Sequence, residues 1–132
     1  MKNSDYEKLK EDFDREGYVF IPGFLEGNDI ARIRDRFEKF IETKVSEMPA
    51  NFVFYEDKND PATLKQLQDI QHYDNFFANI LTGSEFEKIA EILLGEAAIG
   101  KNIEYFNKPP KIGKPTPAHQ DGYYFMLKPN NA

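Results

Sequence analysis

Apolar periodicity changes along this chain, and the order of the changes is what most restricts its fold. Apolar residues recur every three or four positions over residues 4–16 and 28–45, which predicts two amphipathic helices in the first third. Other apolar runs are short or irregular and are typical of strands. The predicted strands are residues 18–21, 52–55, 64–70, 97–108 and 119–126. Because helices come mostly before strands, the sequence favours an α+β fold.

Capping residues give the limits of the predicted helices. A serine followed three positions later by glutamate is a capping box, and a glycine just past an apolar stripe fits a helix end. The sequence holds two such boxes, Ser4 with Glu7 and Ser84 with Glu87, and two such glycines, Gly17 and Gly95. Asp74 fits the N-cap of a further helix that we expect to run through Leu81.

Length and composition indicate one globular domain. The 132 residues, 40% of them hydrophobic, can bury a core, and no apolar run approaches the roughly 18 residues of a membrane span. No apolar leader follows Met1, so we expect a cytoplasmic protein. The absence of cysteine excludes disulfides, thiolate metal sites and cysteine nucleophiles. The net charge of −6, without basic clusters, gives no reason to expect nucleic acid as a partner.

Charge is distributed unevenly between the two ends of the sequence. Residues 101–132 carry a net charge of +3, against −9 for residues 1–100. A positive field near the end of the chain would suit an anionic small molecule. Loop lysines that only keep the protein soluble explain the same charge equally well.

The sequence His119-Gln120-Asp121 is the strongest candidate for a functional site. In an extended strand the side chains of His119 and Asp121 would point the same way, about 7 Å apart along the strand. An imidazole and a carboxylate are two of the three ligands in a 2-His-1-carboxylate Fe(II) site. No histidine follows Asp121. The alternative is a solvated strand end without a metal.

A second histidine lies in the same pattern. His72-Tyr73-Asp74 is also a histidine and an aspartate two positions apart, but Asp74 has a structural role as the expected helix N-cap. We therefore interpret this pair as structural, and give His72 only a minor place as a borrowed third metal ligand. Other active-site motifs are missing, since the chain has neither a glycine-rich phosphate loop before a helix nor a G-x-S-x-G nucleophile elbow.

Five segments, taken in order, resemble the phytanoyl-CoA dioxygenase family of Fe(II)/2-oxoglutarate oxygenases. They are the run from Asp14 to Leu25, Gln68-Asp69-Ile70, Leu93-Leu94-Gly95, Asn107-Lys108-Pro109-Pro110, and His119-Gln120-Asp121 followed by Tyr124-Phe125. The resemblance extends from about residue 8 to the last residue. It implies Fe(II) as the metal, 2-oxoglutarate as co-substrate and a small-molecule substrate.

The resemblance also implies roles for individual residues. His119 and Asp121 match the first histidine and the aspartate of the family's metal triad. An aspartate there, rather than the small residue of related halogenases, implies hydroxylase-type chemistry. Lys108 and Gln66 fall where family members place contacts to the co-substrate or substrate. In each case the alternative is structural: Lys108 flanks a Pro-Pro turn, and Gln66 is a polar residue at a sheet edge.

The second metal histidine and the 2-oxoglutarate-binding arginine of the family have no match in this chain. We therefore expect residues 1–132 to form a single, C-terminally incomplete domain, with N-terminal helices packed on the first strands of an incomplete double-stranded β-helix of the cupin-like, jelly-roll type. Such a chain is expected to be inactive alone and to self-associate through unpaired strand edges. The alternative function is a non-catalytic scaffold or interaction module with a vestigial metal motif.

Overall fold

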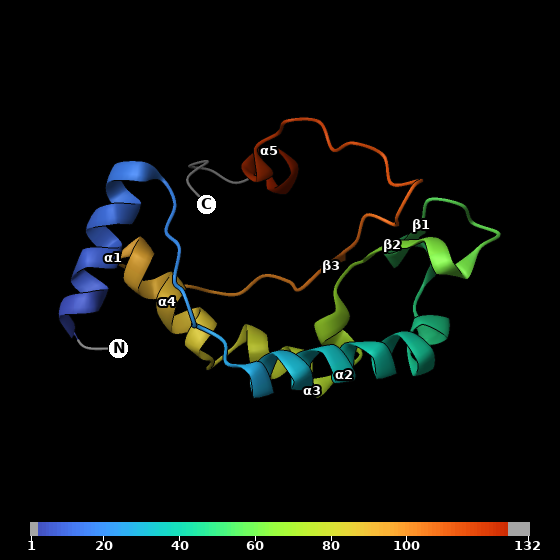
Figure 1. Ribbon diagram of the computed structural model, residues 1–132, viewed down its shortest axis with the longest axis horizontal. Coiled ribbons are helices and arrows are strands. Elements are labelled where there is room, and N and C mark those ends of the chain that lie inside the picture. Colours follow the sequence, from blue (N-terminus) through green and yellow to red (C-terminus); the bar gives the residue numbers. More distant parts are fainter. Residues whose placement is uncertain (1–2, 127–132) are drawn as a thin grey trace.

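The computed structural model of the chain describes residues 3–126 and combines helices with a small sheet (Figure 1). The helices are α1 (Asn3–Glu16), α2 (Gly27–Thr43), α3 (Asn75–Leu81), α4 (Glu85–Leu94) and α5 (Asp121–Phe125). The strands are β1 (Val53–Tyr55), β2 (Leu64–Leu67) and β3 (Tyr105–Phe106). Short 3-10 turns occur at Val45–Glu47, Ala50–Phe52, Pro61–Thr63 and Ile70–His72. The α+β class is confirmed.

The three strands form one antiparallel sheet in the order β1-β2-β3. The central strand β2 pairs Leu67 with Val53 of β1 and with Tyr105 of β3. One position away, Gln66 pairs with Phe54 and Phe106. Because side chains alternate along a strand, these two rows lie on opposite faces of the sheet. Leu67 is fully buried, so its row faces the core, whereas the row with Gln66 faces outward.

The core lies between α2, α3 and the inner face of the sheet. Its most buried side chains are Phe40 of α2, Phe77 of α3, Leu67 of β2, and Ile70. The rings of Phe40 and Phe77 meet edge to face, with centroids 5.5 Å apart. Phe37 of α2 stacks on Tyr105 of β3, with centroids 4.7 Å apart. The expected packing of an N-terminal helix on the strands is therefore present.

Helices α1 and α4 lie side by side at the other end of the molecule (Figure 1). The ammonium group of Lys10 in α1 pairs with Asp14 at 2.9 Å and donates a hydrogen bond to the carbonyl oxygen of Leu93 at 3.1 Å. Gly95 ends α4 with a φ of +76°, a left-handed conformation that glycine adopts without strain. No helix within residues 3–126 is long and apolar enough to cross a membrane.

Helix limits agree with the capping residues. Asp74 caps α3 by accepting the Phe76 N–H at 2.8 Å, and Ser84 caps α4 by accepting the N–H groups of Phe86 and Glu87. The Glu87 carboxylate accepts the N–H of Gly83 instead of that of Ser84, so the second half of this capping box is shifted by one residue. The side chain of Ser4 is outside the described ones, so its capping box stays a prediction.

Three of the predicted strands are absent or mostly absent. Residues 18–21 form no strand, and Phe20 is 81% exposed. Only Tyr105–Phe106 of the expected strand 97–108 is paired, and Ile99 is 93% exposed. Residues 119–126 enter helix α5 at Asp121 instead of continuing as a strand. Each run had the composition of a strand, but strand formation also requires a neighbouring edge to pair with.

Strand 64–70 is shorter than expected. β2 stops at Leu67 and Ile70 begins a 3-10 turn. Asp69 lies between them with a φ of +56°, a left-handed conformation that breaks the strand. Its carboxylate accepts a hydrogen bond from the amide of Gln71 at 3.2 Å. Gln71 is buried, and its own oxygen accepts the N–H of Ile103 at 2.9 Å, which holds this turn against the 97–104 segment.

Candidate metal centre

A proline-rich loop after β3 carries the His119-Gln120-Asp121 motif. The loop starts at Asn107, whose backbone N–H donates to the carbonyl of Lys65 at 2.7 Å and whose side-chain amide donates to that of Leu64 at 3.1 Å. The Gly113 N–H then donates to the carbonyl of Pro109 at 2.9 Å and closes a turn. A Cβ atom on Gly113 would lie 3.0 Å from that same carbonyl oxygen, so the turn favours glycine.

His119 and Asp121 come together at the end of this loop. Gln120 is extended, and α5 begins at Asp121. Nε2 of His119 lies 3.3 Å from Oδ1 of Asp121. The expected proximity of the two side chains is present, although they lie 3.3 Å apart at a helix start and not about 7 Å apart on a strand. An acidic residue in the first turn of a helix is also favourable to the helix dipole.

The two side chains have the geometry of neighbouring metal ligands. Two donor atoms about 2.1 Å from one ion, at right angles to each other, lie about 3.0 Å apart. The 3.3 Å between Nε2 and Oδ1 is close to that spacing. Nδ1 of His119 is 2.8 Å from the carbonyl oxygen of Pro117. If Nδ1 donates its proton there, Nε2 carries no proton, as a metal ligand requires.

The two side chains are open to solvent, and the described part of the chain places no third possible metal ligand beside them. The side chains of His119 and Asp121 are 39% and 75% exposed. Among residues 3–126 no group of three histidine, aspartate or glutamate side chains is close enough together to hold one ion. The side chains of Tyr124 and Phe125 lie outside those described. This part of the chain therefore brings together two candidate ligand side chains, His119 and Asp121.

Gln66 lies in the sheet and is already hydrogen bonded. Its side-chain amide donates to Oε2 of Glu104 at 2.7 Å, and Oε1 of Glu104 accepts from Asn102 at 2.9 Å. Phe54 and Phe106 flank Gln66 on the outward face of the sheet, and both are exposed. A carboxylate beside the amide disfavours a second anion, because like charges repel.

Lys108 stands at the start of the proline-rich loop. It follows Asn107, which is bonded to β2, and precedes Pro109, which is buried. The Lys108 side chain itself is exposed. The structure therefore anchors the backbone of Lys108 on both sides and leaves its ammonium group accessible to a ligand in solution.

Asp74 has the structural role expected for it. Besides capping α3, its carboxylate pairs with Arg36 of α2 at 2.8 Å, and its side chain is only 7% exposed. Burial alone would raise the pKa of Asp74, but the guanidinium of Arg36 and the Phe76 N–H outweigh burial and lower it. His72 is exposed. The ion pair between Asp74 and Arg36 therefore joins α2 to α3. This role supports the structural interpretation of the His72-Tyr73-Asp74 motif.

Replacing Arg36 with alanine is expected to lower the free energy of unfolding by about 1–2 kcal/mol at pH 7, because it leaves a buried carboxylate without its cation. A lowered pKa in the folded state stabilises the protein above the ordinary pKa of the carboxyl, and this contribution is lost as the pH falls below about 4. The difference in the free energy of unfolding between the wild type and Arg36→Ala should therefore shrink in acid. Urea unfolding at pH 7 and pH 3 measures it. Arg34→Ala, on an exposed position of α2, is the control.

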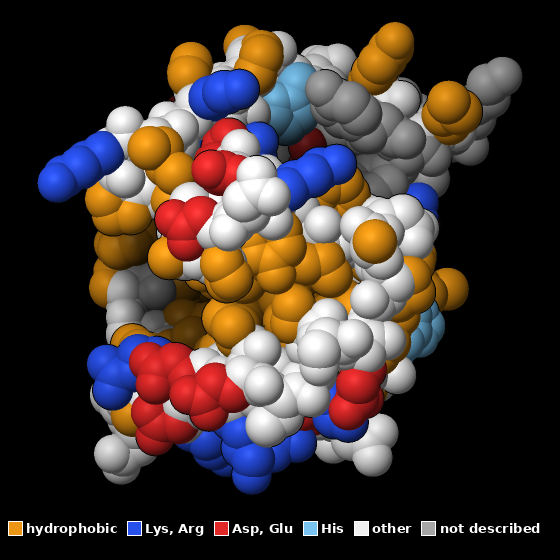
Figure 2. All heavy atoms as spheres, turned by 90° about the vertical axis from the view of Figure 1, so that its right-hand side faces the viewer, with side chains coloured by type: hydrophobic (Ala, Val, Ile, Leu, Met, Phe, Trp, Pro, Cys, Tyr) orange, Lys and Arg blue, Asp and Glu red, His pale blue; other side chains and the backbone are white. Residues whose placement is uncertain are grey.

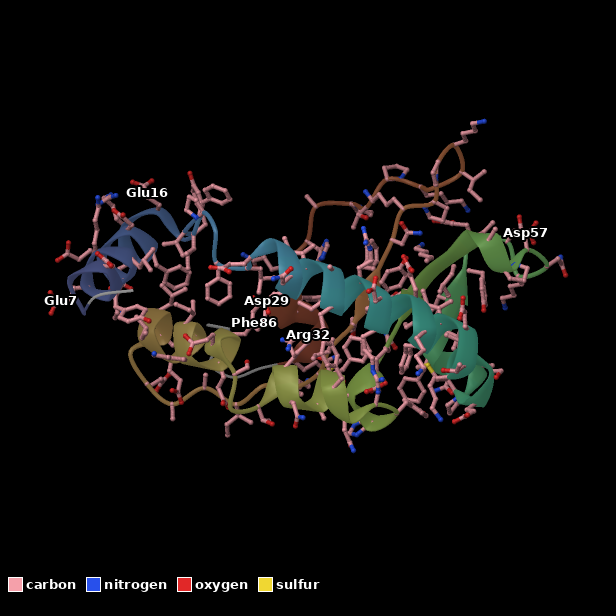
Figure 3. The ribbon with its side chains drawn as sticks, turned by 60° about the horizontal axis from the view of Figure 1, so that its bottom comes forward. Glu7, Glu16, Asp29, Arg32, Asp57 and Phe86 are labelled. Carbon is pink, nitrogen blue, oxygen red and sulfur yellow. The ribbon has the colours of Figure 1, made fainter. Side chains whose placement is uncertain are left out.

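An apolar hollow of about 410 Å³ lies between α2, α3 and α4. Figure 3 shows Asp29 and Arg32 of α2 near Phe86 of α4 at this place. Phe24, Ile33, Phe76 and Ile80 complete most of its apolar lining. Arg32 lies over the ring of Phe76, 5.8 Å from its centroid. None of the site residues predicted from the sequence lines this hollow.

A known protein family matches most of this chain. The family model described as "Phytanoyl-CoA dioxygenase (PhyH)" matches residues 13–132. The chain belongs to this family. The match covers the loop with His119 and Asp121 and helices α2, α3 and α4. The resemblance noted in the sequence is therefore confirmed.

Curated relatives agree with this assignment. The protein named "Phytanoyl-CoA dioxygenase, peroxisomal" is 29% identical in Mus musculus over 130 residues and 28% identical in Homo sapiens over 130 residues. Each alignment covers 90% of this chain and 38% of the relative. The Bos taurus protein of the same name is 26% identical over 129 residues. The chain thus spans little more than a third of these relatives, and no solved structure matches it significantly.

Proposed function

We propose that this chain is the N-terminal part of an Fe(II)- and 2-oxoglutarate-dependent dioxygenase of the hydroxylase type. The observation that carries the proposal is the 3.3 Å approach of His119 Nε2 to Asp121 Oδ1. These are a nitrogen and an oxygen donor of the kind that non-haem Fe(II) prefers. The Pro117 carbonyl supports the proposal because it can orient the imidazole through Nδ1. Membership of the family supports this role for the two residues.

Under this proposal each residue has a defined task. His119 and Asp121 hold the metal, and the Pro117 carbonyl keeps Nε2 of His119 unprotonated. The chemistry supplied by bound Fe(II) and 2-oxoglutarate is oxidation of a substrate C–H bond by O₂, with loss of CO₂. The exposed ammonium of Lys108 attracts the carboxylates of 2-oxoglutarate or an anionic substrate. Gln66 can take part only if its amide leaves Glu104.

The proposed fold of the whole domain is a double-stranded β-helix of which β1, β2 and β3 are the first strands. The outward face of this sheet supports the proposal. It presents Phe54, Gln66 and Phe106, and the two phenylalanines are 38% and 52% exposed. Figure 2 views the molecule from the right-hand end of Figure 1 and shows that apolar side chains are also exposed there, among charged ones. A second layer of strands would bury such a face. We propose residues 1–132 as one part of that single domain.

A non-catalytic interaction module is the second candidate. The hydrogen bond between Gln66 and Glu104 favours it, because a carboxylate at this position opposes the binding of 2-oxoglutarate. Under this alternative His119 and Asp121 are a relic of the metal site. The two functions differ in whether the pair binds a metal ion.

Cobalt(II) binding tests the metal site, since Co(II) replaces Fe(II) in such sites and absorbs visible light. We expect His119→Ala to weaken Co(II) affinity by at least about tenfold, because it removes the nitrogen donor. His72→Ala is the matched control and should leave the affinity unchanged, because His72 belongs to the turn before α3. Equal affinities for the wild type and His119→Ala would contradict the metal site and favour the non-catalytic module.

Activity and association are separate predictions. With two protein ligands from this chain, we expect the 132-residue protein alone to form no succinate from 2-oxoglutarate in the presence of Fe(II). We also propose that it self-associates through open sheet edges, which sedimentation at several concentrations measures. A concentration-independent monomer would contradict self-association.

A small-molecule substrate and a cytoplasmic location are proposed as well. The curated relatives are described as peroxisomal, so cell fractionation of the full-length protein should compare the two compartments.

A further inference from the structure

Glu56 is a buried carboxylate next to β1. Its side chain is only 8% exposed, although it belongs to the hairpin that joins β1 to β2. Its Oε1 atom lies 3.4 Å from Nζ of Lys65 on the neighbouring strand. The same oxygen accepts the backbone N–H of Lys114, also at 3.4 Å. Glu56 therefore connects the hairpin to a residue 58 positions further along the chain.

The environment keeps Glu56 ionised. Burial by itself would raise its pKa, because the charged form loses solvation. The hydrogen bond from the Lys114 N–H and the ammonium of Lys65 outweigh burial, and the pKa of Glu56 lies below its ordinary value. A charged acceptor forms a stronger hydrogen bond than a neutral one. We call this contact of the Glu56 carboxylate with the Lys114 N–H, 3.4 Å long, the tether.

The tether acts on the loop that carries the metal motif. The loop is attached to β2 at Asn107 and to Glu56 at Lys114, so both ends of its first part are held by the same hairpin. Lys114 stands five residues before His119. Two of the intervening residues, Pro115 and Pro117, have restricted φ angles. Because of this restriction, His119 can occupy fewer positions relative to Lys114.

We propose that Glu56 is a positioning residue for the metal centre. By holding the Lys114 backbone against the β1–β2 hairpin, it fixes the starting point of the stiff segment 115–118 and so the place where His119 and Asp121 present their donor atoms. It touches neither the metal nor a substrate. This proposal rests on the proposed function, since it requires a metal at His119.

Cobalt(II) affinity and the visible spectrum of the Co(II) complex test the proposal, with the 132-residue protein and four variants. We expect Glu56→Ala to weaken Co(II) binding by about tenfold, the effect of losing an outer contact that orients a ligand, and to alter the visible spectrum. Glu56→Gln keeps an acceptor oxygen for Lys114 and should restore most of the affinity. Glu42→Ala, an exposed glutamate of α2, is the matched control and should leave affinity and spectrum unchanged. His119→Ala reports whether the ion is bound at the motif at all.

Hydrogen exchange at the Lys114 amide separates the possible outcomes. If Glu56→Ala speeds exchange there and weakens Co(II) binding, the proposal is supported. If exchange is faster while affinity and spectrum stay those of the wild type, Glu56 only stabilises the loop and the proposal is overturned, with the metal site intact. If His119→Ala does not affect Co(II) binding, the metal site itself is wrong and the positioning role falls with it. Should Glu56→Ala fail to fold, Glu56→Asp takes its place with the same two outcomes, because aspartate keeps the charge but is one methylene too short to reach the Lys114 N–H.

Discussion

Replacing Phe77 with alanine is expected to lower the free energy of unfolding by about 3–5 kcal/mol. Phe77 is 2% exposed and stands at the centre of the core. Its ring meets those of Phe37, Phe40 and Phe76 at centroid distances of 5.2, 5.5 and 5.3 Å. Alanine would lose the buried apolar area and these ring contacts, and would leave a cavity between α2 and α3. A domain is stable by only about 5–15 kcal/mol, so the loss is large.

Urea unfolding monitored by circular dichroism measures this effect. The control is Phe20→Ala, the same substitution at a side chain that is 81% exposed, where the change should stay within about 0.5 kcal/mol. A loss for Phe77→Ala no greater than that for Phe20→Ala would contradict the placement of α3 against α2. The same result would contradict the packing of α3 against the turn at Gln71 and against the 97–104 segment.

Replacing Gly100 with alanine is expected to destabilise the protein by about 1–3 kcal/mol through a steric clash. A Cβ atom on Gly100 would lie 2.7 Å from the carbonyl oxygen of Leu81 and 2.5 Å from Cδ1 of the same residue. The oxygen belongs to the backbone at the end of α3, so a rotamer change of Leu81 cannot relieve the contact. The segment after α4 would have to move away from α3.

Gly27→Ala is the matched control for this prediction. Gly27 begins α2, and a Cβ atom there would have no neighbour within 4 Å. Because alanine favours helix more than glycine does, Gly27→Ala should be neutral or slightly stabilising. Thermal unfolding of both variants gives the comparison. If Gly100→Ala is as stable as Gly27→Ala, the close approach of the 97–104 segment to α3 is wrong.

Local signals account for the parts of the fold that could be predicted. Asp74 and Ser84 cap α3 and α4 through N–H groups two or three residues away, and Gly95 ends α4 within its own turn. Such contacts are encoded within a few residues, so sequence patterns are sufficient to locate them. The predicted strands at 18–21 and 97–104 were wrong because an apolar run becomes a strand only beside a free edge.

The candidate site also combines features that sequence patterns could predict with features that they could not. A spacing of two residues brought His119 and Asp121 together as expected, since both belong to one short segment. The contact of Gln66 with the co-substrate stays a prediction, and the sequence did not indicate that its amide donates to Glu104, which lies 38 positions away. No motif pointed to Glu56, because an isolated glutamate after a short strand has no distinguishing pattern. Only its burial and its contact with Lys114 single it out.

The sequence by itself determined the α+β class, helices α1 to α4, the caps of α3 and α4, the family, and the proximity of His119 to Asp121. These depend on periodicity, capping and motif spacing, which act over a few residues or are shared in order with relatives. Only the tertiary structure decided which apolar runs pair as strands, that α5 begins at Asp121, and that Glu56 holds the loop before the metal motif. These features depend on contacts between distant segments, which form only when the chain has closed on its core.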